Sequence, residues 1–146
     1  MQIRTKGIPD NVPKSLCKKA LKFYANLLLG KRLSKNIKLF LVFEKLPNKI
    51  NALCQWEDDN HNCRSFIIIL NKNLNKKTML ISLAHEMVHV KQYARGELKD
   101  YLRDDVVRWK RKIFRLSEVE YWTSPWEVEA YEKDKILYEA FKKERK

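Results

Sequence analysis

Apolar positions recur along the chain with two different spacings. From residue 13 to residue 29, Leu, Ala, Phe and Tyr recur every three or four positions, which predicts an amphipathic helix ending at Gly30. Shorter runs rich in Leu, Val, Ile and Phe follow, and they predict three strands, over Ile37–Phe43, Ile50–Trp56 and Ser65–Leu70. A polar turn joins the second and third strands into a hairpin. Residues 1–10 are polar, and we expect them to form a lead-in without regular structure.

A second helical pattern extends over Thr78–Arg95 without any Pro or Gly, after a polar connection from Asn71 to Lys77. Asn75 is placed to cap its N-terminus, and Gly96 lies where a helix would stop. The apolar spacing is dense, which indicates a buried helix, and it comes from Met79, Leu80, Leu83, Ala84, Met87, Val88 and Val90. After Gly96 the periodicity fits strand and helix equally, and we expect short extended segments near a cleft.

The residues Ser124-Pro125-Trp126-Glu127 predict the start of a third helix, which we expect to reach about Lys142. Ser suits the N-cap, Pro suits the first helical position, and Glu three residues after the Ser completes a capping box. At ~3.6 residues per turn, one stripe of this helix holds Trp126, Ala130, Leu137 and Phe141. Glu127 and Asp134 lie at the edge of that stripe.

Inside the second helical pattern, residues 85–89 read His-Glu-Met-Val-His. Residues four apart on a helix share a face, so His85 and His89 can offer imidazole nitrogens to one metal ion, and Zn2+ accepts such ligands. Glu86 follows the first histidine, so its carboxylate can reach an attacking water rather than the metal, which is the position of a general base. The alternative is two core histidines brought together by chance, but a Glu on a buried helix would be costly without a role.

Two histidines do not complete a catalytic zinc site, which usually has three protein ligands and a water. The third histidine of the chain, His61, lies in the polar turn before the motif, where we expect it to be exposed. Acidic residues of the third helix are the remaining candidates. Glu127 ranks first, because it borders the apolar stripe and because Ala130, one turn on, lets two helices approach closely. Two alternatives remain: Glu127 only closes the capping box, or Glu129 is the ligand.

The motifs His-Glu-Met-Val-His-Val-Lys-Gln and Pro-Trp-Glu-Val-Glu-Ala-Tyr-Glu resemble those of gluzincin-type HExxH zinc metallopeptidases of bacteria and phages. The chain is most similar to the ImmA/IrrE-like and SprT-like groups, over roughly residues 76–142. In the ImmA/IrrE-like pattern the third ligand is the first Glu of a Glu-x-Glu-Ala segment, which corresponds to Glu127. The SprT-like pattern typically has a histidine there, and this chain has none after His89.

Together the patterns and the resemblance predict one α+β zincin-like domain over residues 1–146. It would have a small antiparallel sheet, an HExxH helix and a C-terminal helix with the third ligand. The implied activity is zinc-dependent hydrolysis of a protein or peptide substrate. In that reading Glu86 is the general base, and the zinc ligands are His85, His89 and Glu127.

The net charge of +13, from 31 Lys and Arg against 18 Asp and Glu, favours contact with nucleic acid or another polyanion. The densest basic cluster holds Arg108, Lys110, Arg111, Lys112 and Arg115. The alternative is a solvated surface, because lysines are spread along the whole chain. The cluster supports a second functional hypothesis, a DNA-associated regulatory protein that uses the same zinc-binding fold mainly for binding.

The chain has three cysteines, Cys17, Cys54 and Cys63. A disulfide scaffold usually needs more cysteines and an even number of them, so this number fits a reducing compartment better. We expect Cys17 and Cys54 to be buried structural thiols. No apolar run approaches the ~20 residues needed to span a bilayer, and the first residues lack the apolar core of a signal peptide. We therefore expect a cytoplasmic protein without a membrane partner.

Overall fold

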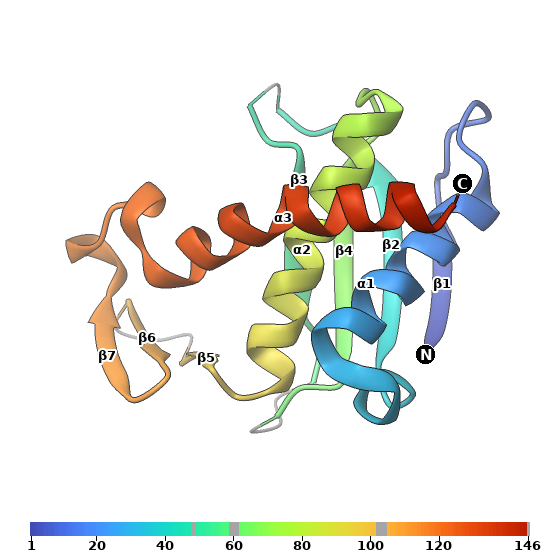
Figure 1. Cartoon of the computed structure of the whole chain (residues 1–146). Coiled ribbons are helices and arrows are strands. Elements are labelled where there is room, and N and C mark those ends of the chain that lie inside the picture. Colours follow the sequence, from blue (N-terminus) through green and yellow to red (C-terminus); the bar gives the residue numbers. More distant parts are fainter. Residues whose placement is uncertain (48, 59–61, 102–104, 146) are drawn as a thin grey trace.

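The computed structural model spans residues 1–146 and describes all of them except 48, 59–61, 102–104 and 146. The described residues form a mixed α+β arrangement of three α-helices and two small sheets (Figure 1). The elements are β1 (Gln2–Lys6), α1 (Lys14–Ser34), β2 (Lys38–Glu44), β3 (Ala52–Trp56), β4 (Ser65–Asn71), α2 (Lys76–Ala94), β5 (Leu98–Asp100), β6 (Val106–Trp109), β7 (Lys112–Arg115), the 3-10 turns η1 (Leu116–Glu118) and η2 (Tyr121–Thr123), and α3 (Pro125–Glu144). His61, expected in an exposed turn, lies outside the described residues.

The first sheet has the strand order β1-β2-β4-β3, and most of it is parallel, so the expectation of an antiparallel sheet is wrong here. β1 pairs in parallel with β2, and β2 pairs in parallel with β4, whereas β3 and β4 form the predicted antiparallel hairpin. The expectation of an irregular lead-in is also wrong, since β1 lies within residues 1–10. The reason is α1, which connects β1 to β2 as a crossover and returns the chain to the same end of the sheet.

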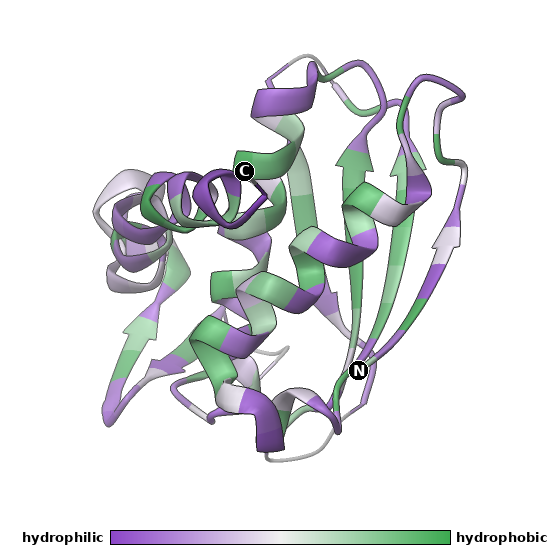
Figure 2. Cartoon of the chain, turned by 45° about the vertical axis from the view of Figure 1, so that its right-hand side comes forward, coloured by the Kyte–Doolittle hydropathy of each residue, from purple (hydrophilic) through white to green (hydrophobic). Residues whose placement is uncertain are grey.

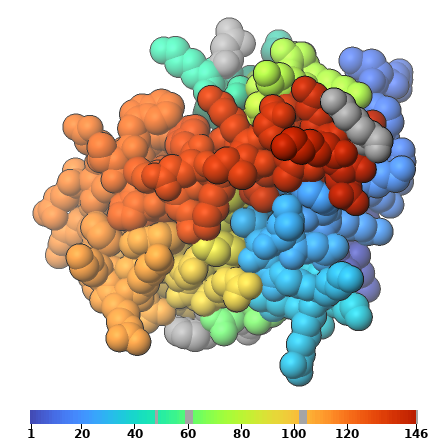
Figure 3. Space-filling model, in the orientation of Figure 1, coloured from blue at the N-terminus to red at the C-terminus, as the bar shows by residue number. Residues whose placement is uncertain are grey.

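Helices α1 and α2 lie on one face of this sheet, and α3 runs across them (Figure 1). In the space-filling view the atoms of α3 extend across the same side of the molecule, next to those of α1 and α2 (Figure 3). The Tyr24 hydroxyl of α1 donates to the Leu80 carbonyl of α2 at 3.0 Å, and the Tyr24 ring packs on Phe141 of α3 with centroids 5.8 Å apart. The two central strands, β2 and β4, are the most hydrophobic part of this sheet (Figure 2). Cys17 is fully buried in this core, as predicted, and burial raises the pKa of its thiol to about 11.

The second sheet is antiparallel, with the order β5-β6-β7, and it confirms the short extended segments expected after Gly96. One face of this sheet packs Leu98, Val107 and Trp109 against Trp126 at the start of α3. The ring centroids of Trp109 and Trp126 are 6.3 Å apart. This second hydrophobic cluster fixes the first turn of α3. The rest of the predicted stripe on α3 is buried as well: Ala130, Leu137 and Phe141.

The helix ends follow local signals in two cases and depart from them in a third. Asn75 caps α2 by accepting an amide hydrogen of the first turn at 2.8 Å, and Gly96 follows the helix with a φ of 70°. Helix α1 breaks at Gly30, where φ is 78°, although helical residues resume beyond it. Ser124 precedes α3 as predicted, but its hydroxyl donates to the Tyr121 carbonyl at 2.8 Å, so no capping box forms. None of the helices in the described part of the chain has the length and apolar character that crossing a membrane requires.

Candidate metal centre

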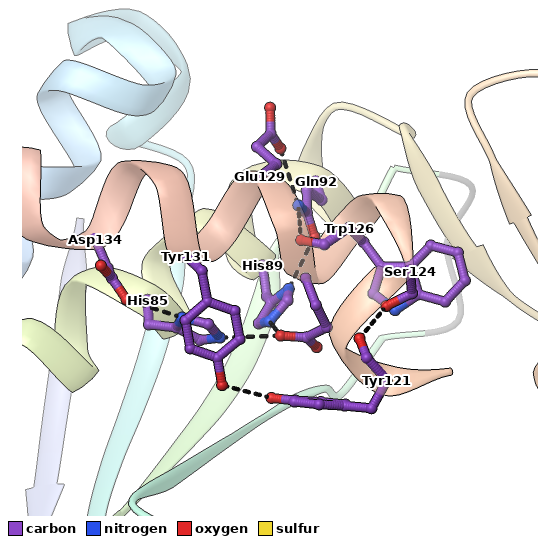
Figure 4. Close-up of polar contacts among 10 residues, drawn as sticks. His85, His89, Gln92, Tyr121, Ser124, Trp126, Glu129, Tyr131 and Asp134 are labelled. Carbon is purple, nitrogen blue, oxygen red and sulfur yellow. Dashed lines mark hydrogen bonds and ion pairs between the residues drawn. The ribbon is translucent and has the colours of Figure 1, made fainter. Parts of the chain in front are cut away.

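The His-Glu-Met-Val-His motif lies within α2, as the spacing predicts. One helical turn separates His85 from His89, and both rings project toward α3 (Figure 4), with centroids 5.1 Å apart. His89 is 8% exposed and the side chain of His85 is 12% exposed, so both imidazoles are largely shielded from water. The buried face of α2 therefore carries two imidazole rings among residues that are otherwise mostly apolar.

Helix α3 brings a carboxylate to the two rings. Glu127 Oε1 lies 3.0 Å from His85 Nε2 and 3.2 Å from His89 Nε2 (Figure 4). Ligand atoms of these three residues, here called the ligand cluster, all lie within 4.8 Å of one another, a separation that one metal ion can bridge. Ala130, one turn after Glu127, is fully buried, and a larger side chain there would push the two helices apart. The three predicted ligands thus come together in space.

The outer nitrogen of each ring also has a partner. His85 Nδ1 lies 3.2 Å from Asp134 Oδ2, and His89 Nδ1 lies 2.8 Å from Gln92 Oε1 (Figure 4). Partners of this kind fix the orientation of an imidazole and direct its other nitrogen toward a metal. Sequence reasoning gave neither residue a role. A usable signal was present, because Gln92 lies one turn after His89 on α2 and Asp134 lies two turns after Glu127 on α3.

The orientation of the Gln92 amide follows from its other contacts. Its Nε2 donates to the Trp126 carbonyl and to Glu129 Oε1, both at 2.9 Å, and neither of these oxygens can donate. The Oε1 atom must therefore face His89, whose Nδ1 carries the proton that it donates. Gln92 is fully buried, so this arrangement is shielded from competing water.

Glu129, the alternative third ligand, does not join the ligand cluster. Its carboxylate accepts hydrogen bonds from Lys91 and Lys133, each at 2.9 Å, as well as from Gln92. Burial alone would raise the pKa of Glu129, but the hydrogen bonds from Gln92, Lys91 and Lys133 outweigh it and lower the pKa to about 2. Glu129 therefore supports Gln92, which in turn supports His89.

The charges of the ligand cluster fit a divalent cation. Each nitrogen of the two rings faces an oxygen that can accept a hydrogen bond, and this arrangement favours the charged form of each imidazole. Burial would lower the pKa of His85, but hydrogen bonds to Asp134 and Glu127 raise it to about 9, and the pKa of His89 is raised against burial in the same way. Burial would raise the pKa of Glu127, yet the two histidines lower it to about 2. A divalent ion that replaces one proton on each ring leaves the net charge of the cluster unchanged.

Glu86 lies beside the ligand cluster without belonging to it. It is 5% exposed, and its Oε2 has no hydrogen-bond partner in the part of the chain that the structure describes. Burial raises its pKa, although the positive charges of His89 and His85 oppose the shift. A buried carboxylate oxygen without a partner is costly. Glu86 also lines the cavity described below, so its carboxyl group lies next to the space that a water or a substrate would occupy.

A cavity of about 800 Å3 opens onto the ligand cluster and Glu86. Part of its lining is strand β3, where Cys54 packs against the hydrophobic core and is partly buried at the wall of the cavity. Burial raises the pKa of its thiol well above the ordinary value, which agrees with the expected structural thiol. Aromatic side chains from η2 and α3 supply another part, namely Tyr121, Trp122 and Tyr131. The cavity thus combines buried acids and imidazoles with exposed aromatic rings.

The basic cluster predicted to bind nucleic acid lies on the β6–β7 hairpin. Paired residues of neighbouring strands share a face, so the register places Lys99, Arg108 and Arg115 together, opposite the face that carries Trp109. The remaining three, Lys110, Arg111 and Lys112, are exposed at the turn and at the start of β7. Two of the five predicted cations, Arg108 and Arg115, therefore share a face with Lys99. Lys110 and Arg111 lie at the turn, and Lys112 pairs with Trp109 on the other face.

Comparison with known proteins gives no family for this chain. No protein-family model, no curated protein and no solved structure matches it. Any functional conclusion must therefore come from the ligand cluster, from Glu86 and from the cavity that joins them.

Proposed function

We propose that the protein is a zinc-dependent metallopeptidase with a zincin-like fold of the gluzincin type. The observation that carries this proposal is the convergence of His85, His89 and Glu127 from two helices, with the carboxylate of Glu86 beside them. Among the described residues, Oε2 of Glu86 has no hydrogen-bond partner. Two imidazoles and one carboxylate are a donor set that catalytic zinc uses, with a fourth position left for water or substrate. The mixed sheet that packs beside α2 is compatible with such a fold.

The chain's own residues would divide the reaction among them. Bound zinc would polarise the scissile carbonyl and lower the pKa of the attacking water toward ~7. Glu86 would accept the proton of that water and later pass it to the leaving amine. Its raised pKa suits this role, because a more basic carboxylate takes up the proton more readily. Asp134 and Gln92 would hold the two imidazoles with Nε2 toward the ion.

Tyr121 and Tyr131 are the candidates for stabilising the negative oxygen that forms during attack. Their hydroxyls lie 3.2 Å apart, and both side chains line the cavity (Figure 4). When the Tyr121 hydroxyl donates to that of Tyr131, the Tyr131 hydroxyl can donate its own proton to an oxyanion. The Tyr131 ring also lies on His85, with centroids 4.4 Å apart, which fixes its position next to the ligand cluster.

The test is hydrolysis of an unfolded protein by the zinc-loaded chain and by Glu86→Gln. The Gln side chain keeps the shape of Glu86 but not its basicity, so we expect retained zinc and at least ~100-fold slower cleavage. The matched control is Glu132→Gln, an exposed acid on α3 that contacts none of the ligand cluster. A zinc-loaded Glu86→Gln protein that cleaves at the normal rate would refute the proposed mechanism.

A second candidate function is a DNA-associated zinc-binding regulator. The observation that favours it is the shared face of Lys99, Arg108 and Arg115, which continues into the basic turn of the β6–β7 hairpin. Glu86 separates the two functions, because a site used only for binding has no need of a general base beside the metal. The two can also coexist, since a peptidase held at DNA would meet DNA-bound proteins as substrates.

A further inference from the structure

Three aromatic side chains at the edge of the cavity are exposed to solvent. Tyr121, Trp122 and Tyr131 are 53%, 68% and 41% exposed. Their rings nevertheless pack on one another, with centroid distances of 5.2 Å for Tyr121–Trp122, 5.3 Å for Trp122–Tyr131 and 6.3 Å for Tyr121–Tyr131. Exposed apolar surface gathered in one place marks a binding region more often than scattered apolar residues do. These three residues are called the aromatic wall below.

The aromatic wall is continuous with the candidate metal centre. Tyr131 packs on His85 with ring centroids 4.4 Å apart, and its hydroxyl reaches Tyr121 at 3.2 Å (Figure 4). Trp122 lines the same cavity as the ligand cluster. Successive residues of an extended peptide are ~3.3–3.6 Å apart. A peptide whose carbonyl reaches the ligand cluster therefore has a neighbouring side chain within reach of the wall.

Exposed apolar area, rather than charge, indicates which kind of side chain suits this wall. Aromatic faces can attract either apolar groups or cations. Lys135, one turn after Tyr131 on α3, is exposed and lines the same cavity, as does Lys49. The whole chain carries a net charge of +13. Acidic residues line the same cavity as well, so charges of both signs surround the wall: Glu86, Asp100, Glu127 and Asp134. The exposed faces of the three rings are instead the surface that an apolar side chain would cover.

We propose that the aromatic wall selects substrates with a large apolar or aromatic side chain next to the scissile bond. The proposal rests on the peptidase function proposed above and names the substrate class for the same cavity. A side chain such as Phe, Tyr, Leu or Met would cover the exposed face of Trp122, and burial of both apolar surfaces would favour that substrate. Small or charged side chains would leave the wall bare.

The test is a set of peptides that differ at one position, occupied by Phe, Leu, Ala, Glu or Lys. We expect the zinc-loaded protein to cleave beside Phe and Leu with the highest kcat/KM. In Trp122→Ala the preference for Phe over Ala should fall by about tenfold or more, the range that pocket contacts typically supply. The matched control is Ile136→Ala on α3, whose side chain is 69% exposed but does not line the cavity. This control should keep the preference of the parent.

Several outcomes would overturn the proposal: equal cleavage beside Phe and Ala, a preference for Lys, or an unchanged preference in Trp122→Ala. Failure of the peptidase function itself is detected separately by binding. In zinc-loaded Glu86→Gln, calorimetry should show tighter binding of the Phe peptide than of the Ala peptide, and Trp122→Ala should remove the difference. Binding with this preference but without hydrolysis by the parent would refute the peptidase and keep the selective wall. Equal binding of the two peptides would refute the wall.

Discussion

The floor and the rim of the cavity are built in opposite ways. On the floor, the ring nitrogens of His85 and His89 and the carboxylate of Glu127 are shielded from water and bonded to fixed partners. On the rim, Tyr121 and Trp122 leave more than half of their side chains exposed. Groups that hold a metal must be positioned before substrate arrives, because reorganising them during the reaction would cost rate. A surface that selects apolar groups gains instead from being bare until the substrate covers it.

The two halves of the floor differ as well. His85 is held by a carboxylate, that of Asp134, whereas His89 is held by the neutral amide of Gln92. The carboxylate adds negative charge behind the first ring. The amide adds none, but it is itself fixed by Trp126 and Glu129. One ring is thus supported by charge and the other by a chain of hydrogen bonds.

Removing a ligand from the floor should have the largest effect on the protein. We expect about one zinc ion per chain in the parent and near-complete loss in Glu127→Ala and His89→Ala, since a three-ligand site tolerates no missing ligand well. Metal analysis after dialysis measures this directly. Added zinc should also raise the melting temperature of the parent but not of these variants. The exposed control Glu132→Ala should behave as the parent does, and full zinc retention in both ligand variants would mean that the ion binds elsewhere.

Substituting the supports behind the rings should have a smaller effect. We expect Asp134→Asn and Gln92→Met to weaken zinc affinity by about 10–100-fold, the usual cost of losing an outer partner of a ligand. Gln92→Met keeps the volume of the side chain but removes its hydrogen bonds. Competition with a chelator of known affinity measures the change. If neither substitution alters affinity, the rings are oriented by packing alone.

Reversing charges on the β6–β7 hairpin should leave the cavity intact and have the smallest effect. On this hairpin Arg111 and Arg115 are exposed, whereas Arg108 is partly buried. We expect weak nucleic-acid binding that falls steeply between ~50 mM and ~200 mM salt, because phosphate contacts release counterions. The combined change of Arg108, Arg111 and Arg115 to Glu should flatten the salt dependence, while Lys14→Glu, Lys18→Glu and Lys22→Glu on α1 serve as a charge-matched control. If the protein causes no electrophoretic mobility shift of nucleic acid at the lower salt concentration, the nucleic-acid hypothesis is wrong and the positive charge serves solubility.

The sequence predicted best what depends on near neighbours. The spacing of His85 and His89, the Asn75 cap and the β3–β4 hairpin are all local, and all are found. The position of Glu127 near the site could be predicted because the apolar stripe of its helix shows which side of the helix faces the core. The same reasoning expected a capping box, but two histidines from α2 compete for the Glu127 carboxylate, and a contact 38 residues distant is invisible in the local pattern.

Elements that depend on distant pairing were missed. Strand β1 has one large aliphatic residue, Ile3, and gains its strand partner only when α1 brings β2 alongside it. The partners of the histidines were missed for a related reason. Gln92 and Asp134 look like ordinary polar residues until α2 and α3 pack and remove them from water. For Cys54 the residue type predicted burial, but its position beside the cavity could not be predicted from the local sequence.

The ligand cluster also sets an order in which the molecule can be assembled. His85 and His89 belong to one helix, but Glu127 lies 42 and 38 residues further along the chain. Helix α2 alone can therefore bind an ion weakly through two ligands, and the affinity rises only when α3 packs against α2 and adds the third ligand. In the folded protein the ion would link α3 to α2 and so stabilise the packing of the C-terminal helix. Chelation should then loosen α3 before the first sheet, and limited proteolysis of the metal-free protein should begin between residues 116 and 124.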